Sequence, residues 1–176
     1  MPEGKIFVLD DDKLIVMMLE RALKKSGYTV KYETTVGDII DKIKSFSPDV
    51  LLLDVNLPEK SGIDILREIK EEGIPAQVVM LTSDNSAETA VKAIKMGAVD
   101  YLTKPFNMEE VKIVINNLIE KLRLVHEVEH LRRVRREYFR KDIIGESPAI
   151  LRLKSDMQKI AEVRVSSVLI TGESIF

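Results

Sequence analysis

Acidic residues stand directly after two short apolar segments of this chain, where they can act together. Asp10 and Asp11 follow the segment Lys5–Leu9, and Asp54 ends the leucine-rich segment "DVLLLD". A carboxylate at the end of a buried strand is costly unless an opposite charge or a metal ion compensates it. Carboxylate oxygens are the ligands that Mg²⁺ prefers, and an aspartate can accept a phosphoryl group covalently. The pattern therefore indicates a divalent-cation site with Asp54 as a candidate nucleophile.

Two further polar residues that suit phosphate chemistry follow later apolar segments. Thr82 comes after the segment Gln77–Leu81, and Lys104 comes after "DYLT". A hydroxyl and an ammonium can hold two oxygens of a phosphoryl group on Asp54 while charge develops there. The ammonium, together with a divalent cation, would also offset the repulsion among the aspartates.

The hydrophobic pattern predicts the framework that brings these strand ends together. Short apolar runs alternate with segments whose apolar residues recur every three or four positions. Expected strands cover residues 5–9, 28–32, 49–54, 77–81 and a short run within 100–106. Expected helices cover residues 13–26, a segment capped by Thr35, a segment capped by Ser61, residues 87–96, and a long segment capped by Asn107. Strict alternation predicts an α/β fold with a doubly wound, five-stranded parallel sheet, and ligands bind such sheets at the carboxyl ends of the strands.

Composition narrows the class of protein further. The 176 residues include 27 basic and 29 acidic side chains and no cysteine. The absence of cysteine excludes disulfides, thiol nucleophiles and thiolate metal sites, and the net charge of -2 gives no general attraction to nucleic acid or anionic membranes. No apolar stretch approaches the roughly 20 residues of a membrane span, and the N-terminus does not resemble a signal peptide. We expect a cytoplasmic protein with no membrane partner.

Four motifs together resemble the receiver domain of two-component response regulators, which has a flavodoxin-like fold. They are "VLDDD", "LLLDVNLPEKSGID", "MLTSD" and "GAVDYLTKPF", and they place a receiver domain at residues 1–120. The resemblance implies that Asp54 is the phosphoacceptor and that a sensor histidine kinase supplies the phosphoryl group. It also implies that Mg²⁺ is the cofactor, held by Asp10, Asp11, Asp54 and the backbone carbonyl of Asn56.

The same resemblance assigns a conformational switch. Thr82 and Tyr101 match the switch pair, in which the hydroxyl moves toward the phosphoryl group and the aromatic ring turns inward. Lys104 matches the phosphate-binding lysine, and Pro105 follows it in what resembles the family's cis peptide bond. We therefore expect phosphorylation of Asp54 to change the surface around the last strand of the sheet.

Asn56 and Asp84 match the two positions that flank the path of the water that removes the phosphoryl group. An amide and a carboxylate can both orient that water, which predicts a short-lived phosphoryl state. An alternative is a metal-dependent phosphotransferase or phosphatase with an aspartyl nucleophile. Such enzymes usually carry a second acid two residues after the nucleophile, where this chain has Asn56. We therefore expect no enzymatic activity beyond self-dephosphorylation.

The last receiver helix is expected to continue beyond the receiver. No glycine or proline interrupts the sequence from Met108 to Asp142, and apolar residues recur at spacings of three and four. A continuous helix with an apolar seam predicts a coiled-coil-like linker at residues 121–141 that forms a homodimer. The expected dimer contacts are Leu118, Leu122, Val125, Val128 and Leu131.

Residues 142–176 differ in character from the rest of the chain. Ser147 can cap a helix that begins at Pro148 and runs to about Val163, before an apolar run "SVLIT" and the letters "GES". This resembles the opening of the AAA+ ATPase domain of sigma-54-dependent, nitrogen-regulatory-type transcription activators. The glycine and lysine that would complete a phosphate-binding loop are missing, so no ATPase activity is expected. The resemblance implies that regions of a larger activator contact ATP, sigma-54 RNA polymerase and DNA, and that phosphorylation resets a homodimer that controls assembly of the ATPase ring.

Overall fold

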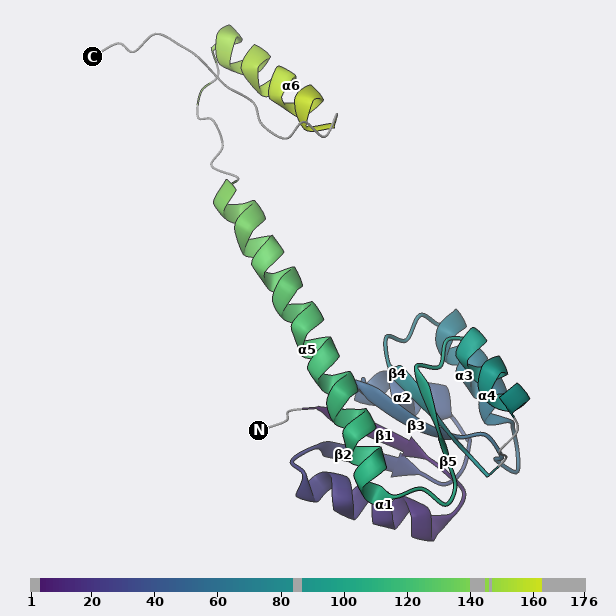
Figure 1. Ribbon diagram of the computed structural model, residues 1–176. Helices are drawn as coiled ribbons and strands as arrows, with labels where there is room; N and C mark the ends of the chain where they lie inside the picture. The colour runs from purple at the N-terminus through teal and green to yellow at the C-terminus, as the bar shows by residue number, and fades with distance from the viewer. Residues whose placement is uncertain (1–3, 84–86, 140–144, 146, 163–176) are drawn as a thin grey trace. The chain divides into compact units, whose positions relative to one another are not determined.

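A five-stranded parallel sheet organises the first part of the computed structural model shown in Figure 1. The structure describes residues 4–83, 87–139, 145 and 147–162. The strands are β1 (Lys5–Leu9), β2 (Thr29–Glu33), β3 (Val50–Asp54), β4 (Gln77–Thr82) and β5 (Asp100–Thr103). They pair in the order β2-β1-β3-β4-β5, and all four pairings are parallel. The predicted doubly wound α/β fold is confirmed.

Helices cover both faces of the sheet. They are α1 (Lys13–Lys25), α2 (Ile39–Phe46), α3 (Gly62–Glu71), α4 (Ala87–Lys95) and the N-terminal part of α5 (Met108–Phe139). A further helix, α6 (Pro148–Glu162), follows α5 in the chain. Buried residues of α2, α3 and α4 form one core with the sheet, and those of α1 and α5 form a second core on the opposite face (Figure 1). The central strand β3 serves both cores, because Leu51 and Leu53 pack in the first and Leu52 in the second. A strand buried on both faces needs the uninterrupted leucines of its sequence.

Local capping sets where most helices begin. Asp12 Oδ1 accepts hydrogen bonds from the backbone N–H groups of Leu14 at 2.8 Å and Ile15 at 3.4 Å, which starts α1 directly after the acidic motif. The prediction that Thr35 caps the second helix is wrong, because α2 begins only at Ile39. Asp38 has a φ of 52°, in the left-handed region, so the helix cannot extend back through it.

The long helix α5 is anchored in the core of the sheet at its N-terminal half. Its 32 residues are continuous, as predicted, and the side chains of Val111 and Ile115 are fully buried against the sheet. The Tyr28 hydroxyl donates a hydrogen bond to Asn116 Oδ1, which ties α5 to the segment between α1 and β2. None of the helices in the described ranges is long and apolar enough to cross a bilayer.

The chain divides into two units, residues 1–128 and 129–176, and the division falls within α5. The second unit contains α6, which begins at Pro148 as predicted, with Ser147 Oγ accepting a hydrogen bond from the Ile150 N–H at 3.3 Å. The predicted strand "SVLIT" and the "GES" motif lie outside the described residues. The domain boundaries proposed at residues 120 and 141 stay predictions.

Gly62 allows α3 to begin against the end of β3. Its N–H donates to the Val55 carbonyl at 3.0 Å, and a Cβ atom at this position would lie 1.9 Å from the backbone oxygen of Asp54. Only glycine tolerates this approach, since the obstructing atom is backbone. Gly62 therefore helps to fix the strand end that carries Asp54.

Replacing Gly62 with alanine should destabilise the protein by about 1–3 kcal/mol, because the added methyl group forces β3 and α3 apart. Gly37→Ala is the matched control, since its Cβ atom would meet no atom within 4 Å. The control should leave the free energy of unfolding unchanged or slightly higher. Urea denaturation followed by circular dichroism measures both, and equal stabilities of the two variants would contradict the argument.

Candidate metal and phosphoryl-acceptor site

The register of the sheet brings the sequence-predicted residues to one edge. Leu9 pairs with Leu53, so the next residues, Asp10 and Asp54, emerge side by side from β1 and β3. Thr82 of β4 pairs with Thr103 of β5, so Lys104 follows at the same level. Parallel pairing thus gathers the functional side chains at the carboxyl end of the sheet, where the strand order changes direction.

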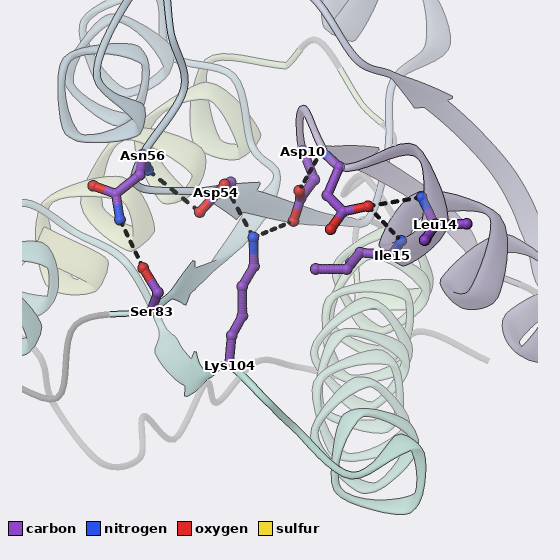
Figure 2. Close-up of polar contacts among 8 residues, drawn as sticks. Asp10, Leu14, Ile15, Asp54, Asn56, Ser83 and Lys104 are labelled. Atoms are coloured by element: carbon purple, nitrogen blue, oxygen red, sulfur yellow. Dashed lines mark hydrogen bonds and ion pairs between the residues drawn. The ribbon is translucent and has the colours of Figure 1, made fainter.

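Lys104 joins two buried carboxylates. Its Nζ atom lies 2.7 Å from Asp10 Oδ2 and 3.0 Å from Asp54 Oδ2 (Figure 2). Asp10 is fully buried and Asp54 is 3% exposed. Backbone N–H groups also face these acids, since that of Asp12 donates to Asp10 Oδ1 at 3.0 Å and that of Asn56 donates to Asp54 Oδ1 at 3.3 Å. The site therefore holds its charges in fixed positions.

The pKa values of Asp10 and Lys104 are both raised, for different reasons. Burial raises the pKa of the Asp10 carboxyl, and the contacts with Lys104 and the Asp12 N–H only partly counteract it. Burial works to lower the pKa of the Lys104 ammonium, but the two facing carboxylates outweigh burial, and that pKa is raised. Lys104 is therefore a permanent cation near neutral pH.

The acidic cluster fits a hard divalent cation. Asp10, Asp11 and Asp54 each offer a carboxylate oxygen, and these oxygens lie within 4.8 Å of one another. In the described part of the chain, the buried Asp10 Oδ2 is paired with the Lys104 ammonium and with no other group. Three carboxylates around one ammonium leave an excess of negative charge, and oxygen ligands of this kind suit Mg²⁺.

Asn56 lies at the rim of the cluster and connects two loops. Its Nδ2 donates a hydrogen bond to Ser83 Oγ at 3.1 Å, from the loop after β3 to the loop after β4 (Figure 2). Both residues are exposed. Asp84, the other residue predicted to tune dephosphorylation, lies outside the described residues.

The other predicted switch residues occupy different environments. Thr82 is buried, and its carbonyl accepts a hydrogen bond from the Lys104 backbone N–H at 2.6 Å. Tyr101, on the edge strand β5, is 43% exposed, so its ring is outside the core in this structure. The peptide bond between Lys104 and Pro105 is cis. The switch roles of these residues stay predictions.

Two contacts that shape the site were not anticipated from the sequence. Gly62 supports the end of β3. The one local sign of this role in the sequence is that a poor helix former stands at the first helical position, directly after the capping Ser61. Ser83 contacts Asn56 across two loops, and no local pattern announces a contact between residues so far apart in the chain.

The comparisons with known proteins agree with the geometry. Residues 6–116 match the response regulator receiver domain family. The DNA-binding transcriptional regulator NtrC of Proteus hauseri is 32% identical over 174 residues, which cover 99% of this chain and 36% of that protein. The regulatory protein AtoC of Escherichia coli K12 is 30% identical over 172 residues, which cover 97% of this chain and 37% of that protein. This chain thus spans little more than a third of the length of these curated relatives.

Among solved structures, the BeF3-activated receiver domain of DrrB from Thermotoga maritima is 36% identical, with a TM-score of 0.61 over 67% of this chain and 98% of that one. The family match covers the five strands, apart from Lys5 at the start of β1, and the acidic cluster, and it extends into the first turns of α5. This chain therefore belongs to the response regulator receiver domain family.

Proposed function

We propose that this chain is the phosphorylation-controlled regulatory region of a two-component transcription activator. Asp54 accepts a phosphoryl group from a sensor histidine kinase: a carboxylate oxygen bonds to phosphorus as the bond from phosphorus to the donor nitrogen breaks. The observation that carries this proposal is the Lys104 ammonium, 3.0 Å from Asp54 Oδ2. An ammonium in that position can hold a phosphoryl oxygen and stabilise charge during transfer.

Mg²⁺ is the proposed cofactor, held by Asp10, Asp11, Asp54 and the Asn56 backbone carbonyl. When bound, it supplies positive charge that stabilises the transferring phosphoryl oxygens. The aspartates support this assignment through their oxygens within 4.8 Å of one another. Asp11 is exposed and so is open to an entering ion, whereas Asp10 is already engaged with Lys104.

The chemistry of the site favours a switch over an enzyme that turns over external substrates. The position two residues after the nucleophile carries Asn56, whose carboxamide has no proton to give as a general acid near neutral pH and is engaged with Ser83. The phosphoryl group would therefore leave Asp54 only by hydrolysis, as a timed return to the resting state.

The regulatory target is proposed from the relatives. NtrC and AtoC match over nearly the whole of this chain, which spans little more than a third of their length. We infer that the intact protein is a sigma-54-dependent activator with an AAA+ ATPase domain, and that the receiver controls assembly of the ATPase ring. ATP, sigma-54 RNA polymerase and DNA would be contacted by regions beyond residues 1–176.

We further propose a homodimer that forms through α5. The five predicted dimer residues lie in two different environments. Leu118 packs against the receiver core and Leu122 is half-buried. Val125, Val128 and Leu131 are exposed. Leu124 is also 51% exposed. Leu124, Val128 and Leu131 follow spacings of four and three, so they form one stripe on the helix, here called the exposed stripe. A second copy presents the same stripe, and two such helices can pair about a twofold axis.

Phosphorylation at Asp54 is tested with a small phosphoryl donor and Mg²⁺, by intact-protein mass spectrometry. Wild-type chain should gain one phosphoryl group, and Asp54→Asn should gain none. Asp41→Asn, which changes an exposed aspartate on α2 away from the cluster, should behave as wild type. Equal labelling of the Asp54→Asn variant would place the acceptor elsewhere.

Magnesium binding is tested by urea denaturation with Mg²⁺ or with EDTA. Wild type should gain about 2.7 kcal/mol of stability when Mg²⁺ is present at about 100 times its dissociation constant. Asp11→Asn should lose most of this gain, whereas Asp12→Asn should keep it, because asparagine also caps a helix well. The assignment of Asp11 fails if both variants respond to Mg²⁺ as wild type does.

The dimer is tested by sedimentation velocity, with and without beryllofluoride. Leu131→Glu should weaken self-association by about tenfold or more, because it places an unpaired charge in an apolar contact. His130→Glu adds an acidic side chain at the adjacent exposed position, on another face of the helix, and should leave association unchanged. A wild-type chain that stays monomeric in both conditions would refute the proposed dimer.

A further inference from the structure

The hydrogen bond between Asn56 and Ser83 crosses the rim of the site beside the proposed phosphoacceptor. Asn56 Nδ2 donates to Ser83 Oγ at 3.1 Å, and the Asn56 backbone N–H donates to Asp54 Oδ1 at 3.3 Å (Figure 2). Asn56 is thus held at both ends, by its backbone to the acceptor carboxylate and by its side chain to the loop after β4. An exposed carboxamide without such a partner would sample several rotamers.

The bond also decides which end of the carboxamide is occupied by Ser83. A carboxamide has one donor end and one acceptor end. With Nδ2 engaged by Ser83, Oδ1 is the end of the carboxamide that can accept a hydrogen bond from water. A water that attacks phosphorus needs such an acceptor, because an acceptor orients the water and attracts its departing proton.

We propose that Ser83 is a positioning residue for hydrolysis of the Asp54 phosphoryl group, acting through the carboxamide of Asn56. In this step the water oxygen bonds to phosphorus, and the bond from phosphorus to the Asp54 oxygen breaks. The Asp54 carboxylate returns, and inorganic phosphate and a proton leave. The inference rests on the proposed function of Asp54, and it assigns to Ser83 a control over how long the phosphorylated state lasts.

The size of the effect follows from the position of the bond. It is an exposed, neutral hydrogen bond, whose contribution corresponds to about a two- to tenfold change in a rate. Ser83→Ala removes the acceptor and should lengthen the phosphoryl lifetime by that factor. Ser83→Thr keeps a hydroxyl at the same position and should restore the wild-type lifetime.

The experiment measures loss of the phosphoryl group at saturating Mg²⁺ after the small donor has been removed. It uses wild type, Ser83→Ala, Ser83→Thr, Asn56→Ala and the Asn56→Ala/Ser83→Ala double variant. If Ser83 acts through Asn56, the Ser83→Ala change has no further effect in the Asn56→Ala background. The side-chain amide resonances of Asn56 should also shift in unphosphorylated Ser83→Ala, while the urea midpoint stays unchanged.

Two results would overturn the assignment of Ser83. One is a Ser83→Ala lifetime equal to that of wild type; the other is an effect of Ser83→Ala that persists in full when Asn56 is alanine. Either result leaves the phosphoacceptor intact, since the chain has then been labelled. A wild-type chain that takes up no phosphoryl group overturns the proposed function, and the role of Ser83 with it.

Discussion

The position of the Lys104 ammonium between Asp10 and Asp54 is the constraint on which the rest of the site depends. Two carboxylates, both almost fully buried, could not share this space without a cation, because desolvation and mutual repulsion act together. The ammonium offsets only part of the charge, and Asp11 adds a third carboxylate nearby. The resting site is therefore poised to take up further positive charge, and a phosphoryl group on Asp54 would change the electrostatic balance that now holds Lys104 in place.

The strand that carries Asp54 is fully packed, whereas the loops at the rim of the site are exposed. Leu51, Leu52 and Leu53 are fully buried, so the end of β3 has little freedom to move. Asn56, Ser83 and Tyr101 are exposed on the loops and the edge strand around it. We therefore expect a change of charge at Asp54 to be relieved at the rim and along β5. Lys104 directly follows β5 and is separated from the start of α5 by three residues, Pro105 to Asn107. The site is connected to the long helix by a very short segment of chain.

Periodicity and strand-end chemistry were sufficient to predict the sheet, the helix order and the residues of the acidic cluster. Both signals are local, since apolar spacing identifies each element and the parallel topology then brings the strand ends together. The features that sequence reasoning missed depend on other information. The start of α2 depends on the backbone conformation of Asp38. The need for glycine at position 62 depends on the path of β3. The contact of Ser83 with Asn56 depends on the spacing of two loops. Each is fixed by the assembled fold.

Helix α5 shows why one sequence pattern can conceal two surfaces. Its apolar residues looked like one seam, yet Val111, Ile115 and Leu118 pack on the receiver core, whereas Leu124, Val128 and Leu131 are exposed. The half-buried Leu122 lies four positions after Leu118, on the same side of the helix as the packed residues. Leu124, the first exposed residue, lies two positions later, and such a step turns an α-helix by about 200°. The exposed stripe therefore lies nearly opposite the packed one. A dimer built on the exposed stripe leaves the receiver core undisturbed, so one helix can be anchored in the receiver and paired with a second copy at once.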